Sequence, residues 1–232
     1  MPGVYISGMS AGLPDVDPVE FSSSKAFGRE TVYASISGHP DIFFFKLRED
    51  LVVHAPGIDH TYTDIFRRNG IRTVPGSKVP DGKYPRTCSY NAVKIGRFMF
   101  HNLEHTDPVI KELGLEAGLD FVHVPQGYAR CSTLVLDDRH IVTSDKGIYL
   151  EAQKRGITAG LVSAGGVELP GEKYGLIGGA SGTLPDGRVF IAGDLLTHPD
   201  GLRIKEMFSR AGVISLEVHS APLFDAGTVI FV

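Results

Sequence analysis

Seven polar residues, widely separated along the chain, carry functional groups that can work together in chemistry. They are His39, Asp41, Asn91, Cys131, Ser181, Asp225 and Thr228. The thiol is a potential nucleophile, the imidazole is a potential acid or base, and the carboxylates are potential binders of a cation. The amide and the hydroxyls can hold a small polar ligand. Whether these groups cooperate depends on the elements that position them.

From Asp41 onward the chain repeats one order of elements: a β-rich run, a polar turn, a second β-rich run, a capped helix and a third short strand. The period is about 40 to 50 residues. Four such modules span roughly residues 41–75, 91–125, 131–165 and 180–220. This order predicts an α/β protein built from ββαβ modules.

The helix of each module is marked by its capping residues. We expect helices over Asp59–Asn69, from Asp107 and Pro108 onward, over Asp145–Arg155, and over Asp200–Arg210. An aspartate at the start can accept hydrogen bonds from the free amides of the first turn, and a glycine beyond the end can adopt the left-handed conformation.

The two ends of the chain supply the parts of a fifth module, residues 225–232 with 1–37. Gly227–Val232 and Val4–Ser7 each read as a strand without a hairpin partner, so we expect them to pair. Pro14–Gly28 is then the fifth helix and Thr31–Ile36 the fifth closing strand. This pairing closes one domain, 1–232, into a ring that hides its edge strands. The alternative is an open α/β sheet with similar elements.

In the ring arrangement, the first strand of every module lines a central channel. The seven polar residues lie at the entrances of these strands, so the ring predicts that they converge at one place. The open sheet makes no such prediction.

Several short motifs resemble those of one protein family. They are SGHPDI (37–42), SYNAV (89–93), PQGYARCS (125–132), TSDKGI (143–148), IGGASG (177–182), HPD (198–200) and DAGTVIF (225–231). Together they resemble an uncharacterised bacterial family of the pentein fold, the fold of the guanidino-group-modifying enzymes and amidinotransferases. Gly175–Phe208 is the best local match. The resemblance implies a five-fold pseudosymmetric α/β propeller of ββαβ modules.

For the active members of this fold, the resemblance implies a cysteine nucleophile, a histidine acid or base, and carboxylates that bind a guanidinium. They carry the cysteine in the final module, but Leu223–Val232 contains none. If the protein is an enzyme, Cys131 would replace that nucleophile, with His219 or His39 moving protons and Asp41 and Asp225 on the guanidinium. The other interpretation of Cys131 is a small buried thiol.

Other residues offer weaker signals. Arg130 is a potential partner for a ligand carboxylate. His101 and His105 are four residues apart but lack the glutamate of a zincin motif, and we expect no metal and no cofactor. Gly178 and Gly179 belong to no complete phosphate-binding motif. Cys88 lies in a polar loop and is interpreted as incidental.

The composition excludes several classes of partner. The 232-residue chain has a formal net charge of −4, so it offers no basic surface for nucleic acid, and no run is apolar enough for a membrane span. Its two cysteines are typical of a cytoplasmic protein. The leading hypothesis is a protein that binds a small polar ligand, guanidino or amino-acid-like, in the channel. The alternatives are a Cys131-dependent amidine hydrolase or transferase and a non-catalytic interaction scaffold. The sequence does not predict the oligomeric state.

Overall fold

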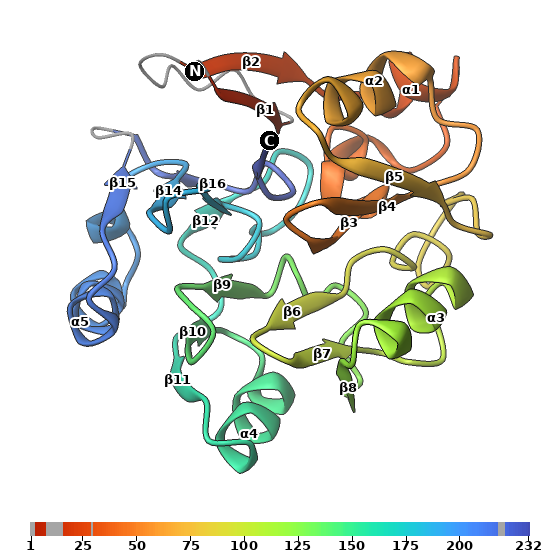
Figure 1. Ribbon diagram of the computed structural model, residues 1–232. Coiled ribbons are helices and arrows are strands. Elements are labelled where there is room, and N and C mark those ends of the chain that lie inside the picture. Colours follow the sequence, from red (N-terminus) through yellow and green to blue (C-terminus); the bar gives the residue numbers. More distant parts are fainter. Residues whose placement is uncertain (1–2, 8–15, 29, 218–220) are drawn as a thin grey trace.

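The computed structural model describes residues 3–7, 16–28, 30–217 and 221–232. Five three-stranded sheets are arranged around a common centre, and the longer helices lie on the outside (Figure 1). The protein is thus a mixed α/β protein made of small sheets. None of the helices in the described ranges is both long and apolar enough to cross a membrane.

Four of the sheets come from consecutive ββαβ units, as the sequence predicts. The first two units are β3 (Phe44–Arg48), β4 (Leu51–His54), α2 (His60–Arg68) and β5 (Arg72–Pro75), then β6 (Val93–Ile95), β7 (Phe98–His101), α3 (Pro108–Glu116) and β8 (Asp120–His123). The next two are β9 (Thr133–Val135), β10 (His140–Thr143), α4 (Lys146–Lys154) and β11 (Thr158–Leu161), then β13 (Ser181–Thr183), β14 (Val189–Ile191), α5 (Gly201–Ala211) and β15 (Ser215–Glu217).

The fifth sheet joins the two ends of the chain. It consists of β17 (Ile230–Phe231), β1 (Gly3–Ser7) and β2 (Val16–Glu20), in the order β17-β1-β2. In all five sheets the first strand is antiparallel to the middle strand, which is parallel to the third. Tyr5 pairs with Phe231, so the expected pairing of the terminal strands is present.

Two expectations for the fifth module are wrong. The third strand is β2, within the range expected to be helical, and only the short helix α1 (Ser23–Phe27) follows it. Thr31–Ile36 is not a strand: Val32 makes an isolated bridge to Gly82, and Ala34–Ile36 is a 3-10 helix. Pro18 makes β2 hard to predict from the sequence, but β2 is an edge strand, where proline is tolerated.

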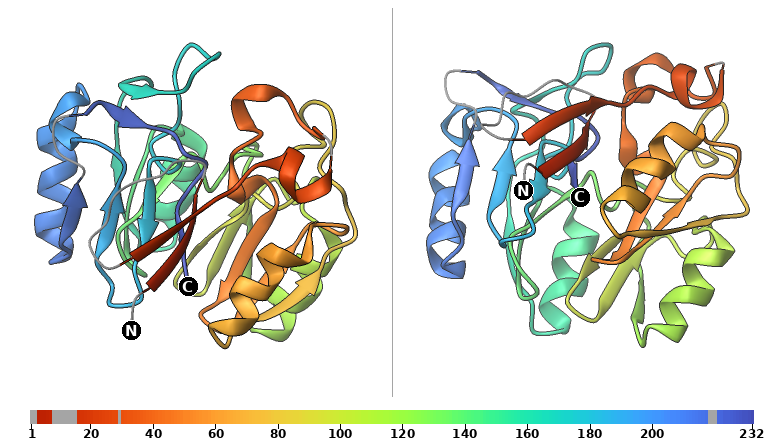
Figure 2. Two further views of the ribbon diagram at one scale, coloured as in Figure 1. Left: turned by 90° about the horizontal axis from the view of Figure 1, so that it is seen from above. Right: turned by 45° about the horizontal axis from the view of Figure 1, so that its top comes forward.

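The sheets stay separate, and the described residues contain no closed sheet. A sixth, two-stranded sheet joins β12 (Val167–Glu168) to β16 (Leu223–Phe224). Figure 2 shows β1 and β17 lying between the β13–β15 sheet and the β3–β5 sheet. The ends of the chain therefore fill the gap between the first and fourth units.

Most of the capping predictions hold. Asp59, Asp107 and Asp145 precede α2, α3 and α4, and each side chain accepts a hydrogen bond from a first-turn amide. Asp200 precedes α5 but does not cap it; its Oδ2 instead accepts from Ser163 N at 2.7 Å. The apolar residues form three buried clusters, the largest of which packs Phe21, Phe44 and Phe66 between α2 and the β3–β5 sheet. These clusters fix the strands whose starts meet at the centre.

Candidate functional site

The residues just before the first strands meet at the centre of the molecule. Asp41 lies on the 3-10 turn Pro40–Ile42 that leads into β3, and Asn91, Cys131 and Thr228 lie two residues before β6, β9 and β17. All four side chains are buried. Equivalent places in four modules thus supply one polar cluster.

Asp41 is the acceptor that joins this cluster. Its Oδ2 accepts a hydrogen bond from Cys131 Sγ at 2.8 Å and another from Thr228 Oγ1 at 2.9 Å. Asn91 holds Cys131 from the other side, because its Nδ2 donates to Sγ at 3.2 Å and its Oδ1 accepts from Cys131 N at 3.1 Å. The thiol therefore has a fixed orientation toward a carboxylate.

The second oxygen of Asp41 has no such bond. Asp41 Oδ1 is buried without a hydrogen-bond partner among the described residues. Burial raises the pKa of Asp41 to about 6, although His39 and the bond from Cys131 act in the opposite direction. A buried carboxylate oxygen without a donor is rare in proteins and calls for an explanation.

His39 and Asp225 form a second part of the site. His39 Nδ1 lies 3.9 Å from Asp225 Oδ1, and the two side chains are 4% and 2% exposed. Asp225 is held by backbone amides: Leu176 N donates to Oδ2 at 2.8 Å and Gly227 N donates to Oδ1 at 3.0 Å. Ligand atoms of His39, Cys131 and Asp225 all lie within 4.8 Å of one another.

Close backbone approach makes this arrangement possible. A Cβ on Gly179 would collide with the Asp225 carboxylate, and one on Gly227 would collide with His39. Gly227 and Thr228 both have positive φ, at 66° and 73°. A β-branched residue in the left-handed region is strained, and such strain concentrates at functional sites.

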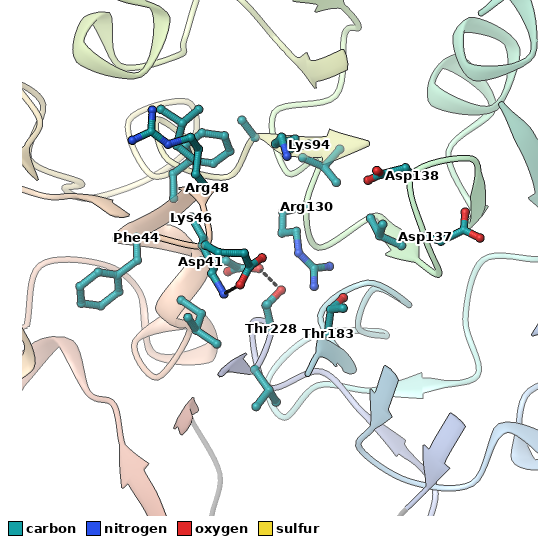
Figure 3. Close-up of a pocket in the computed structure, with 18 of the residues that line it drawn as sticks. Asp41, Phe44, Lys46, Arg48, Lys94, Arg130, Asp137, Asp138, Thr183 and Thr228 are labelled. Carbon is teal, nitrogen blue, oxygen red and sulfur yellow. Dashed lines mark hydrogen bonds and ion pairs between the residues drawn. The ribbon is translucent and has the colours of Figure 1, made fainter. Parts of the chain in front are cut away.

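Two pockets border the site. The larger, of about 240 Å³, includes Asp41, Arg130 and Thr228 in its wall, and the smaller, of about 190 Å³, includes His39 and Asp225. Figure 3 shows Asp41 and Arg130 facing each other in the larger pocket, with Lys94 beyond Arg130 and Thr183 beside Thr228. The two parts of the site thus border different pockets.

Cys131 is a protonated thiol in this environment. Burial raises its pKa well above the usual value, the carboxylates of Asp41 and Asp225 raise it further, and the bond from Asn91 only partly opposes them. Burial also raises the pKa of Cys88 to about 11. Since the thiolate is the nucleophile, neither cysteine is activated without a bound cation nearby.

This leads to a prediction about labelling. In the native protein at pH 8, iodoacetamide should modify Cys131 and Cys88 much more slowly than a free thiol, because both are buried and protonated. After unfolding in urea, both should react. Mass spectrometry of peptides measures each rate. Rapid labelling of Cys131 in the native state would contradict the assignment.

The other expected site residues have different positions. Arg130 lines the larger pocket, but its guanidinium also donates to the carbonyls of Thr133, Gly178 and Ser181. Ser181 is buried and its hydroxyl donates to Gly178 O at 2.8 Å, so it faces its own turn. His219 lies outside the described residues.

Some residues that shape the site carry no clear sequence signal. Lys94, on β6, lines the larger pocket and forms no hydrogen bond or ion pair with any described residue. Ser132 and Thr133, next to Cys131, have buried hydroxyls that lack partners within the described ranges. A lysine between apolar residues of a strand is typical of an ordinary solvent-facing position, so the sequence does not single out Lys94.

Comparison with known proteins gives a distant structural likeness and a family. No curated protein matches the sequence. The structure is similar to that of a histidine-to-glycine variant of dimethylarginine dimethylaminohydrolase, solved as an adduct with S-methyl-L-thiocitrulline. The TM-score is 0.42 at 14% identity, with 74% of this chain and 70% of the other covered. Residues 19–230 match the profile of a family of unknown function, DUF6873, and the chain belongs to that family.

Proposed function

We propose that the protein has a pentein-like, five-module architecture and binds a small zwitterionic molecule in the pocket above Asp41. The ligand carries an N–H-rich cation, a guanidinium or an ammonium, and a carboxylate. The architecture is supported by the shared strand order and directions of the five sheets. The binding site is supported by the chemistry of the pocket.

The observation that carries the proposal is the orphaned oxygen of Asp41. Oδ1 belongs to a buried carboxylate in the wall of the larger pocket and lacks a described donor, whereas Oδ2 already accepts from Cys131 and Thr228. A ligand N–H would satisfy it, and a cationic donor makes a stronger hydrogen bond than a neutral one.

The charges around the pocket favour a zwitterion over a simple cation. Four acidic and four basic side chains line it: Asp41, Glu49, Asp137, Asp138, Lys46, Arg48, Lys94 and Arg130. Lys46 forms an ion pair with Glu49, and Arg48 forms one with Asp50. Lys94 has no described partner and is the cation left for the ligand carboxylate.

The approach of Cys131, His39 and Asp225 within 4.8 Å favours a second candidate, thiol-dependent chemistry on an amidine. In that reaction the Cys131 thiolate would attack the amidine carbon, the bond from that carbon to an amine nitrogen would break, and His39 would give the departing amine a proton. Water would then release the product from the sulfur. A bound cation would lower the pKa of Cys131, which is otherwise too high for attack.

The test is calorimetry with guanidino compounds, amino acids and their derivatives, in the presence of a chelator. Lys94→Met should lower the affinity for the zwitterion roughly tenfold, to that of its decarboxylated analogue, since one charged contact is lost. Lys154→Met, an exposed lysine paired with Glu151, is the matched control. The proposal fails if no compound binds, or if Lys94→Met leaves the difference between zwitterion and analogue unchanged.

Mass spectrometry of the incubated ligand separates the two candidates. A ligand consumed by the wild type and by Cys88→Ala, but not by Cys131→Ala, would establish thiol chemistry. A ligand that binds to all three proteins and is consumed by none would establish a binding protein.

A further inference from the structure

Three buried side chains from distant parts of the sequence lie close together at the site. Ligand atoms of His39, Cys131 and Asp225 lie within 4.8 Å of one another, and the three residues are 3%, 3% and 2% exposed. The proposed organic ligand contacts Asp41 and Lys94 and uses none of the three. They therefore call for a separate explanation.

The donor set fits a zinc ion. Zinc binds thiolate, imidazole and carboxylate in a tetrahedral arrangement, with bonds of about 2.0–2.3 Å, so neighbouring donors stand about 3.3–3.8 Å apart. His39 Nδ1 and Asp225 Oδ1 are 3.9 Å apart. The spacing of the donor atoms is thus close to that of a zinc site even without an ion.

A second observation points the same way. His39 Nδ1 is buried and has no hydrogen-bond partner among the described residues, although it faces Asp225 Oδ1 at 3.9 Å. That separation is too long for a hydrogen bond and too short for an intervening side chain. An imidazole nitrogen and a carboxylate oxygen in this relation are placed to share an ion.

Neighbouring groups also orient the donors. Two backbone amides, of Leu176 and Gly227, hold the Asp225 carboxylate, and Asn91 Nδ2 donates to Cys131 Sγ at 3.2 Å. Hydrogen bonds of this kind fix the direction of metal ligands and tune them. The smaller pocket has His39 and Asp225 in its lining, so it is the side from which an ion would enter.

We propose that His39 Nδ1, Cys131 Sγ and Asp225 Oδ1 bind one zinc ion, with a fourth position open toward the smaller pocket. On binding, the S–H bond of Cys131 breaks, the sulfur keeps the electron pair and bonds to the ion, and the proton leaves to solvent. Thiolate and carboxylate together balance the charge of Zn²⁺. Asp41 Oδ2 loses the thiol donor and keeps Thr228. Because the ion occupies the sulfur electron pair, it would block the thiol chemistry considered above.

Cobalt(II) provides the direct test. After dialysis against a chelator and its removal, one equivalent of Co²⁺ should give a thiolate-to-cobalt charge-transfer band and the intense visible bands of a tetrahedral site, and Zn²⁺ should abolish them. Cys131→Ser should lose the charge-transfer band. His39→Gln and Asp225→Asn should weaken Co²⁺ binding by roughly tenfold or more, the effect of disturbing even an outer-shell partner.

Matched controls keep the test specific. Cys88→Ser and His60→Gln change the other cysteine and an exposed histidine, and both should retain the spectrum. Zn²⁺ should raise the melting temperature of the wild type but not of Cys131→Ser, because an ion bound only to the folded state stabilises it. Circular dichroism checks that each variant is folded, and the wild-type spectrum decides the thiolate ligand even if one variant is not.

Three results would overturn the zinc site. They are a wild-type protein without a charge-transfer band, a band that survives in Cys131→Ser, and a band lost in Cys88→Ser alone. Binding of the organic ligand is measured in the presence of a chelator, and binding of zinc is measured in the absence of the organic ligand. The failure of one proposal is therefore distinguishable from the failure of the other.

Discussion

Asp41→Asn is expected to weaken binding of the cationic ligand by roughly thirtyfold at pH 8, because a hydrogen bond to a charged group contributes about 2 kcal/mol. The substitution keeps the shape of the side chain and an oxygen that can accept from Cys131 and Thr228. What it removes is the negative charge at the orphaned Oδ1 position. Calorimetry in chelator measures the change. Asp81→Asn, an exposed aspartate outside the pocket, is the control and should bind like the wild type.

The pH dependence of binding identifies the same carboxylate. Burial raises the pKa of Asp41 to about 6, so below that pH the ligand must displace a proton. The affinity of the wild type should therefore fall about tenfold for each pH unit below 6 and level off above it, since one proton is exchanged for one ligand. Asp41→Asn should show no step near pH 6. A step of equal size in the variant would assign the titration to another group.

The free energy of unfolding should follow the opposite trend. A carboxyl whose folded pKa is above its unfolded value of 3.8 contributes most stability below that value, and the contribution is lost as the pH rises through about 6. For Asp41 the loss is at most about 3 kcal/mol. As the pH rises from 4 to 7, the stability of Asp41→Asn should thus increase relative to that of the wild type. Urea unfolding at both pH values measures this difference.

Gly178→Ala is expected to destabilise the protein by about 3 kcal/mol or more, near the upper end of overpacking effects. A Cβ there would collide with the backbone carbonyls of Arg130 and Thr133, which cannot rotate away as a side chain can. Gly178 O also accepts from the Arg130 guanidinium and from Ser181, so the shift would disturb the pocket wall. Urea unfolding measures the free energy.

Gly156→Ala separates packing from backbone strain. Gly156 has a φ of 74°, and nothing lies within 4 Å of its hypothetical Cβ. Its substitution should cost only about 1–2 kcal/mol, the penalty of a left-handed alanine. If both variants cost the same, close packing at Gly178 is not what fixes the site.

Elements with local signals were predictable from the sequence. Asp107 with Pro108 marks the start of α3, and Asp59 and Asp145 mark α2 and α4, because capping depends on residues within one turn. β2 is not predictable from local sequence, since its Pro18 is typical of a non-strand segment and only the sheet order makes it an edge strand.

The sequence predicts which residues meet at the candidate site better than it predicts the contacts between them. Asp41, Asn91, Cys131 and Thr228 each precede a first strand, so a repeated module brings them together. That Cys131 donates to Asp41, and not to a histidine, depends on side-chain packing across modules. The same holds for Ser181, whose hydroxyl turns to Gly178 O. Local sequence spacing carries no information on such contacts, and it also hides the approach of His39 to Asp225.

The most direct test of the account is a crystal structure of the protein with its tightest guanidino or amino-acid ligand, prepared in chelator. We expect the ligand cation within hydrogen-bond distance of Asp41 Oδ1 and the ligand carboxylate beside Lys94. A ligand bound elsewhere on the molecule, with Asp41 Oδ1 untouched, would contradict the proposed function.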